Sequence, residues 1–478
     1  MDSSIYRFRN TPALLDGFHE LENQEIYFAS PWELNDPLEG YKNLLWRGDA
    51  IVWRNFLRHY ILCLMQAILR TLEHGAEYRV TAETLPVDMI DSDLHPQVRG
   101  IFDTICDRVF ADPELAPLPA LLESRKAPMP RNELLSLLWP VHFRIFPLVC
   151  TTLQPEQPIH TIDAYFRERG DRPLRLKESF AALDAIEEKR ADSADIEEAM
   201  TYRFVSAIEQ TTFIRAYNGA DQQHGQAWNV IGSTLPEIYL NALEKLLYRD
   251  WYTACFVAEP TQAAMWGHYA DGHKGVCLKF KTSVATSAKP GLMLRRAMGV
   301  KGSKTDLQVH YDFGLMELHE IQYQDRYPEI DFFRSLGRIT HRQLTFWFRG
   351  TDGAISETGG DLLRETEEWR KGYWDNYHAA VTTKLKDWEH EREYRATLQS
   401  YVLDLSERET RKLKYRFEDL QGIIFGLKTT PQDKAALVRI IQEKCRAAGR
   451  KDFELHQAYY ARRTGRIATT KWDLVQLG

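Results

Sequence analysis

The chain is poor in cysteine, and its cysteines lack the spacing of a metal site or a disulfide framework. The six cysteines among 478 residues lie far apart, at Cys63, Cys106, Cys150, Cys255, Cys277 and Cys445. A zinc ribbon needs CxxC pairs, and the sequence has none. We therefore expect buried, reduced thiols and predict no metal site.

Signals for export and membrane insertion are also missing. The N-terminal sequence MDSSIYRFRN has no basic segment followed by an apolar run. The most apolar long stretch, 51–72, contains Arg54, Arg58, His59 and Arg70, and charges near the middle of a span are costly in lipid. We expect a cytoplasmic protein without membrane contact, in which 51–72 is a core or interface helix.

The chain has no excess of basic charge. Its formal net charge is -7, which argues against nucleic-acid binding through the overall field, although a local basic groove could still bind nucleic acid. Aromatic residues make up 12% of the chain and include twelve tryptophans, which favours large packed surfaces or stacking pockets. The sequence contains no internal repeat and predicts no oligomeric state.

Strand-like and helix-like segments alternate in a way that predicts an α+β protein. Strands are expected at 5–8, 25–29, 253–258, 275–280, 318–323, 393–398 and 423–426. Helices are expected at 11–21, 53–72, 132–138, 196–214, 235–247, 332–348, 362–386 and 431–447, with connecting segments at 111–130 and 155–173. We predict a split mixed or antiparallel β core formed by 1–49 and 251–478 with peripheral helices, and a large helical insertion at 50–250.

The first unusual motif is YRFR, followed by SPWELNDPLEG at 30–40. In an alternating strand, Arg7 and Arg9 project to the face opposite Tyr6, so two guanidinium groups could converge on a phosphate or carboxylate. The alternative is a charged solvent face. The Asn-Asp-Pro sequence at 35–37 is typical of a turn.

The second motif is MWGHYADGHKG at 265–275, between two predicted strands. Its histidines, aspartate, lysine and glycines could supply a general base, His268 being the candidate, or a phosphate-binding backbone. His268 and His273 are five residues apart, a spacing that disfavours a helical metal pair. A helix that starts at Thr261 and is capped by Gly272 accounts for much of the motif without any function.

The third motif is KLKDWEHEREYR at 384–395. If a strand starts at Glu393, then Glu391, Glu393 and Arg395 lie on one face, where the arginine keeps a carboxylate ionised. Such a carboxylate could stabilise a developing cation or accept a proton. The alternative is a solvated charged face.

Taken in order, these segments resemble a prokaryotic family called domain of unknown function twenty-nine seventy-one. The resemblance rests on YRFR, YFASPWELNDPLEG, CFVAEPTQAAMWGHYADGHKGVCLKF, HEIQY, KLKDWEHEREYR and IIFGLKTT. It touches both ends of the chain and leaves 50–250 without a motif. The layout is similar to that of a divergent ADP-ribosyltransferase, which places a polar or basic residue on an early strand, an aromatic and Ser/Asn segment next, and a glutamate on a late strand.

The resemblance implies NAD as a substrate and assigns roles to individual residues. The late glutamate, Glu391 or Glu393, would stabilise an oxocarbenium-like ribose, while arginines hold the diphosphate. Two departures are the pair of late glutamates and the arginine that stands in YRFR where several transferase families have histidine. The NAD-binding positions would be Tyr6, Arg7, Arg9, Ser30, Trp32, Asn35 and Arg395.

Three functional hypotheses follow. The first is an NAD-dependent ADP-ribosyltransferase-like enzyme, an effector in a toxin or phage-defence setting, whose acceptor is a macromolecule or small molecule recognised through the helical insertion. The second is a non-enzymatic sensor or interaction protein in which Arg–Glu pairs and tryptophan packing are structural. The third is a metal-dependent hydrolase or nuclease that uses Asp36, Glu39, His268 and His273. The first predicts that the candidate residues line one pocket.

Overall fold

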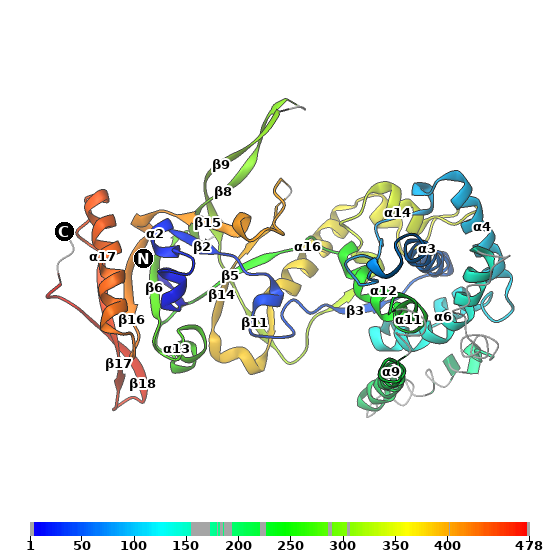
Figure 1. Cartoon of the computed structure of the whole chain (residues 1–478), viewed down its shortest axis with the longest axis horizontal. Helices are drawn as coiled ribbons and strands as arrows, with labels where there is room; N and C mark the ends of the chain where they lie inside the picture. The colour runs from blue at the N-terminus through cyan, green and yellow to red at the C-terminus, as the bar shows by residue number, and fades with distance from the viewer. Residues whose placement is uncertain are drawn as a thin grey trace. The chain divides into compact units, whose positions relative to one another are not determined.

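The computed structural model describes residues 4–153, 173–178, 180–181, 185, 194–219, 226–284, 289–303, 306–400 and 402–475. The chain divides into two compact units (Figure 1). Unit 1 comprises Met1–Tyr41, Asp250–Tyr327 and His378–Gly478, and unit 2 comprises Lys42–Arg249 and Pro328–Tyr377. Helices and mixed sheets occur together, so the predicted α+β class is confirmed.

An eight-stranded sheet forms the centre of unit 1, in the order β10-β14-β5-β1-β6-β16-β17-β18. Neighbouring strands are antiparallel except for the parallel pair β16–β17. Because β1 lies between β5 and β6, the N-terminal segment and the C-terminal half build one core, as predicted. The strands are β1 (Ser4–Arg9), β5 (Tyr252–Val257), β6 (Val276–Lys281), β10 (His319–Glu320), β14 (Glu393–Leu398), β16 (Leu420–Phe425), β17 (Glu454–Ala461) and β18 (Arg466–Lys471).

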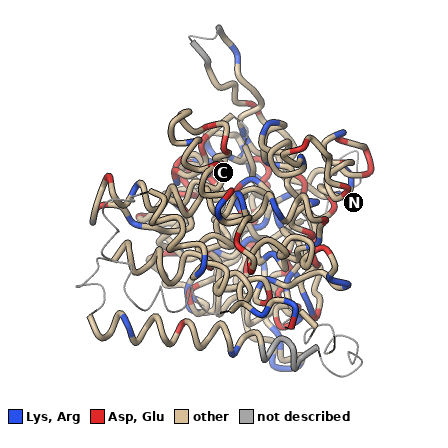
Figure 2. Tube along the Cα trace, turned by 90° about the vertical axis from the view of Figure 1, so that its right-hand side faces the viewer, with Lys and Arg blue, Asp and Glu red and all other residues tan. Residues whose placement is uncertain are grey.

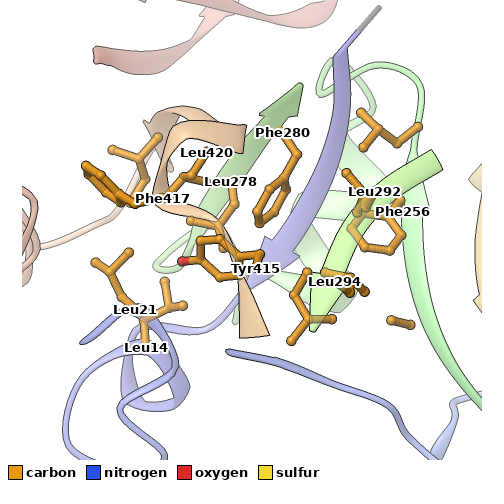
Figure 3. Packing of buried hydrophobic residues seen from close by; sticks show 14 of the residues in the cluster. Leu14, Leu21, Phe256, Leu278, Phe280, Leu292, Leu294, Tyr415, Phe417 and Leu420 are labelled. Atoms are coloured by element: carbon orange, nitrogen blue, oxygen red, sulfur yellow. The ribbon is translucent and has the colours of Figure 1, made fainter. Parts of the chain in front are cut away.

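A second, antiparallel sheet of unit 1 has the order β2-β15-β8-β7, and β9 pairs with β8. Its long β8–β9 hairpin was not predicted. Apolar side chains of both sheets share one buried cluster, in which the rings of Phe280 and Tyr415 are 5.1 Å apart (Figure 3). The strands are β2 (Glu25–Tyr27), β7 (Ser283–Val284), β8 (Pro290–Ser303), β9 (Asp306–Glu317) and β15 (Lys412–Tyr415).

Short helices and turns complete unit 1. The longest helix, α17 (Pro431–Ala448), begins where Thr430 accepts a hydrogen bond from the Asp433 amide and ends at Gly449, which has a φ of 64°. Its buried residues Leu437, Ile441 and Cys445 recur every four positions and join the shared cluster. The other elements are α1 (Thr11–Leu14), α2 (Glu20–Asn23), α13 (Ala263–Tyr269), the parallel pair β11 (Gln322–Gln324) and β13 (Thr383–Leu385), and the 3-10 turns η1 (Pro31–Glu33), η6 (Lys386–Glu391) and η7 (Arg408–Arg411).

Unit 2 is mainly helical. A small sheet, β12 (Glu329–Asp331), β3 (Asn43–Trp46) and β4 (Met129–Pro130), accompanies the helices. The segment Pro328–Tyr377 belongs to this unit, whereas the sequence prediction gave 50–250 to the helical part and 328–377 to the core. The helices are α3 (Ala50–His74), α4 (Pro96–Ala111), α5 (Leu118–Glu123), α6 (Arg131–Leu153), α9 (Ala194–Tyr217), α11 (Gln226–Ser233), α12 (Leu235–Leu243), α14 (His341–Phe348), α15 (Gly360–Leu363) and α16 (Glu367–Thr382), which runs on into unit 1.

Helices α3 and α6 carry much of the interior of unit 2. The apolar stretch 51–72 lies in α3, whose buried residues place it in the core, as predicted. Helix α6 is long and apolar enough to cross a membrane, but 61% of its most apolar window is buried inside the protein, and core helices pass the same test. Most of the predicted connecting segment 155–173 lies outside the described residues. In the view of Figure 2, basic and acidic residues are interspersed along the trace.

Two fully buried histidines are hydrogen-bonded to tyrosines inside unit 2. The Nδ1 atom of His59 lies 2.9 Å from the Tyr239 hydroxyl, and Nδ1 of His142 lies 2.7 Å from the Tyr60 hydroxyl. Burial lowers the pKa of both histidines to about 4, because the interior disfavours the imidazolium.

We expect acid to destabilise unit 2. In the unfolded chain these histidines take up protons at about pH 6.5, so between pH 6.5 and 4 the unfolded state binds more protons than the folded state. Stability should therefore fall by roughly 1.4 kcal/mol per pH unit for each histidine over this window. Urea unfolding followed by amide exchange in α3 measures it, and H59Q or H142Q should each reduce the slope. Equal slopes in all three proteins would contradict the prediction.

Candidate functional site

A cavity of about 520 Å³ lies in unit 1 where strand β5 changes partners. Near its end β5 pairs with β1 through Val257 and Tyr6, but at its start Thr253 pairs with Ala29, which follows β2. Two backbone hydrogen bonds of 2.8 Å join Ala29 and Thr253. Segments 6–10 and 253–257 both line the cavity, whose volume is typical of a small-molecule site.

The structure brings six of the ten predicted site residues to this one cavity. They come from three segments far apart in the sequence and are Tyr6, Arg7, Arg9, Asn35, Glu391 and Glu393. Their convergence is part of the arrangement that the first hypothesis predicts, which also placed His268 in the pocket.

The other four predicted residues do not line the cavity. Ser30 instead donates hydrogen bonds from its amide and hydroxyl to Glu33 Oε2, at 2.7 and 3.0 Å. The side chain of Trp32 is 88% exposed, and His268 is also exposed. Arg395 is fully buried behind Glu393, so its role in this structure is to hold other residues.

One wall of the cavity is an ionic network. Glu391 accepts hydrogen bonds from the Tyr269 hydroxyl at 2.5 Å and from Lys384 Nζ at 2.7 Å. Lys384 Nζ also lies 2.8 Å from Glu393 Oε2, and Arg395 Nε donates to Glu393 Oε1 at 2.6 Å. These contacts fix both glutamate side chains at the cavity wall.

Arg395 connects this network to the second sequence segment. It forms two parallel hydrogen bonds of 2.6 Å to Glu39, in the geometry that guanidinium and carboxylate groups prefer, and donates to the Val381 carbonyl at 3.0 Å. The carboxylates of Glu39, Glu391 and Glu393 face only two formal positive charges, those of Lys384 and Arg395. The five-residue network therefore carries one excess formal negative charge.

Burial rules out the solvated face that was the alternative for the third motif. Glu391, Glu393 and Arg395 are all buried. Desolvation alone would raise the pKa of Glu393, but the charges of Arg395 and Lys384 outweigh it and lower that pKa. Burial, followed by the negative charge of Glu391, raises the pKa of Tyr269 well above its usual range. Tyr269 is therefore a neutral donor to Glu391 at physiological pH.

Arg7 brings to the same cavity a positive charge that has no carboxylate within ion-pair distance among the described residues. The residue is 7% exposed, its Nη2 donates to the Tyr27 carbonyl at 2.9 Å, and its guanidinium lies 5.4 Å from the Phe256 ring. Its Nη1 has no hydrogen-bond partner among the described residues. Burial, followed by the like charge of Arg9, lowers the pKa of Arg7 to about 10, so it remains charged at neutral pH.

The neighbouring Arg9 has a different environment. Its Nε donates to Glu20 Oε2 at 2.8 Å, and its Nη2 contacts the other oxygen of the same carboxylate. Glu20 therefore neutralises Arg9. The two arginines of YRFR do not act as the equal pair that the sequence suggested.

The second motif contributes to the cavity through residues that were not predicted. Met265 and Tyr269, on α13, line it. The helix ends at Tyr269 rather than at Gly272. A side chain on Gly275 would meet the Arg9 carbonyl at 2.3 Å, so this glycine permits close approach to β1. Among the described residues, no group of three or more His, Cys, Asp or Glu side chains is arranged to hold a metal ion.

Sequence reasoning missed several residues that build the site. Lys384 and Tyr269 lie inside the quoted motifs, so they could have been included as possible partners of the glutamates, and Glu39 was named only for the hydrolase hypothesis. Tyr27 and Arg408 also line the cavity. Tyr27 begins the quoted motif YFASPWELNDPLEG and was not recognised as a site residue, whereas Arg408 lies outside every quoted motif and only the fold brings it there.

We expect Arg395→Met to destabilise unit 1 by about 3–5 kcal/mol, because it leaves two buried carboxylates without their main partner. The matched control is Arg392→Met, which removes an exposed arginine three residues away and should cost less than about 0.5 kcal/mol. Urea unfolding monitored by amide exchange in β14 measures both values. Similar losses in the two variants would show that the network does not stabilise the sheet.

A comparison with protein-family models gives a match to part of the chain. Residues 265–396 match the family model described as Protein of unknown function (DUF2971). Comparisons with curated proteins and with solved structures give no match. The matched stretch includes Tyr269, Lys384, Glu391, Glu393 and Arg395, which build the ionic wall of the cavity. The match is confined to residues 265–396, and it agrees with the resemblance carried by the motifs of the sequence.

Proposed function

We propose that unit 1 binds NAD in this cavity and transfers its ADP-ribose group to an acceptor. The observation that carries the proposal is the charge distribution inside one cavity. Arg7, a buried guanidinium without a carboxylate partner among the described residues, lines the same space as the buried carboxylates Glu391 and Glu393. NAD has an anionic diphosphate and a cationic nicotinamide ring, so it offers a complementary charge to each.

The network beside Glu391 suits a reaction that develops positive charge. Transfer breaks the bond between the ribose C1′ and the nicotinamide nitrogen, and the bonding electron pair leaves with nicotinamide. Positive charge then develops on the ribose, where a fixed carboxylate in a partly desolvated site stabilises it. The acceptor forms a bond to C1′ and loses a proton. We assign Glu391 as the base that accepts this proton.

Of the two late glutamates, Glu391 is the proposed catalytic residue. Glu393 contacts two cations, Lys384 and Arg395, so its negative charge is largely neutralised by the protein itself. Glu391 contacts one cation, Lys384, which it shares with Glu393, and one neutral donor, Tyr269. We therefore assign Glu393 to positioning Lys384 and Glu391 to the reacting ribose.

The structural hypothesis accounts for part of the same site. The Arg395–Glu39 pair and the buried Trp266 have the roles that it predicted for arginines and tryptophans. It gives no reason for a buried Arg7 beside a cavity, because an unpaired buried charge is costly unless a ligand compensates it. A non-enzymatic sensor that binds the dinucleotide without cleaving it is the remaining form of this hypothesis.

The hydrolase hypothesis is less well supported. It needs Asp36, Glu39, His268 and His273 to hold a metal together. The carboxylate of Glu39 is used by Arg395, and His268 is exposed. The cavity is lined by unit 1 alone, so in the proposed enzyme unit 2 is available to recognise a target, as the toxin or phage-defence setting would require.

We expect the protein to release nicotinamide from labelled NAD, and Glu391→Gln to lower that rate by roughly 10²-fold or more, because it removes the charge that stabilises the ribose. Glu389→Gln is the matched control, since Glu389 is exposed in the same turn and does not line the cavity. Its rate should equal that of the parent.

Three results bear on the assignment. If calorimetry detects no NAD binding, the proposal is wrong. Binding without nicotinamide release would favour the sensor. Equal rates in Glu391→Gln and the parent, with both proteins folded, would remove Glu391 from the reaction.

A further inference from the structure

A second cation at the cavity, Arg408, also has no carboxylate partner among the described residues. It lies in η7, its side chain is exposed, and it lines the cavity. Its guanidinium lies 4.6 Å from the centre of the Phe18 ring and 4.7 Å from that of Tyr27. Two aromatic contacts therefore hold an otherwise mobile side chain at the cavity.

The other cations that line the cavity are neutralised by the protein itself. Glu20 pairs with Arg9, and Glu391 and Glu393 pair with Lys384. Arg7 and Arg408 are then the lining cations that, within the described part of the chain, have no carboxylate within ion-pair distance. Their charge is available to a ligand.

Tyr27 fixes both of these arginines. Its carbonyl accepts a hydrogen bond from Arg7, and its ring lies against Arg408. The ring is itself held, because the Tyr27 hydroxyl donates to the Glu33 carboxylate at 2.8 and 3.0 Å. The two guanidinium groups are thus anchored to one rigid residue before any ligand binds, which lowers the entropic cost of binding.

We propose that Arg7 and Arg408 form a diphosphate-binding subsite of this cavity, with Tyr27 as the residue that positions both. Arg408 can donate two parallel hydrogen bonds to one phosphoryl group, and Arg7 can donate from Nη1, which has no partner among the described residues, to the phosphoryl group linked to it. Phe18, which is exposed and lines the cavity, offers apolar contact to the group that carries the diphosphate. The proposed function enters this inference in one respect only, because it identifies the diphosphate ligand as NAD.

The test is calorimetric titration of the full chain with inorganic pyrophosphate, inorganic phosphate, ADP and NAD. We expect pyrophosphate, ADP and NAD to bind, and phosphate to bind at least tenfold more weakly than pyrophosphate. Arg408→Gln should raise the Kd for pyrophosphate at least tenfold. Because Arg408 is exposed, this variant should fold like the parent.

The matched control is Arg416→Gln. Arg416 is also exposed and lies over an aromatic ring, 4.6 Å from Phe313, but it does not line the cavity. Its substitution should leave the Kd unchanged. Arg7→Gln should weaken pyrophosphate binding as Arg408→Gln does, and its melting temperature shows whether a loss of binding reflects unfolding.

The outcomes separate the subsite from the proposed reaction. Pyrophosphate binding that depends on Arg408, together with no cleavage of NAD, would support the subsite and overturn the transferase. Cleavage of NAD with an unchanged Kd and rate in Arg408→Gln would support the transferase and overturn the subsite. Equal affinity for phosphate and pyrophosphate, or equal losses in Arg408→Gln and Arg416→Gln, would also overturn the subsite.

Discussion

The ion pair between Arg395 and Glu39 is the contact on which the candidate site depends. It joins residues 356 positions apart, is fully buried, and uses both oxygens of the carboxylate. The same guanidinium holds Glu393, which in turn holds Lys384 beside Glu391. Buried charges are tolerated only when they are paired and hydrogen-bonded, so a change at any member affects the others. The position of the proposed catalytic carboxylate therefore follows from a structural ion pair.

The change of pairing partners along strand β5 explains why a cavity exists at this place. On this side, its end pairs with β1 of the same sheet and its start pairs with Ala29, which follows β2 of the second sheet, and the cavity lies between these two segments. The space is lined by Arg7, whose charge no described carboxylate neutralises, and by a network with one excess negative charge. A ligand with separate anionic and cationic groups would compensate both, which is the physical basis of the proposal for NAD.

Much of this fold follows from local sequence patterns, and the rest does not. The predicted strand at 393–398 has the same bounds as β14, and the predicted helix at 431–447 ends one residue before α17 does, because alternation and capping residues are local signals. The β8–β9 hairpin was missed although residues 307–315 of β9 alternate between apolar and polar or glycine, the pattern of a strand with one buried face. The segment 328–377 was assigned to the wrong part because its partners lie in unit 2, and periodicity does not say which surface a helix packs against.

The site was predicted with similar limits. The sequence motifs identified Arg7, Asn35, Glu391 and Glu393, which line the cavity. They also included Trp32 and His268, which are exposed, because a sequence does not distinguish an exposed residue from one that lines a cavity. The measurement that tests the central claim most directly is a crystal structure with a non-hydrolysable NAD analogue. The account predicts its diphosphate at Arg7 and its nicotinamide ribose against Glu391. An analogue bound elsewhere, or no bound analogue at saturating concentration, would contradict it.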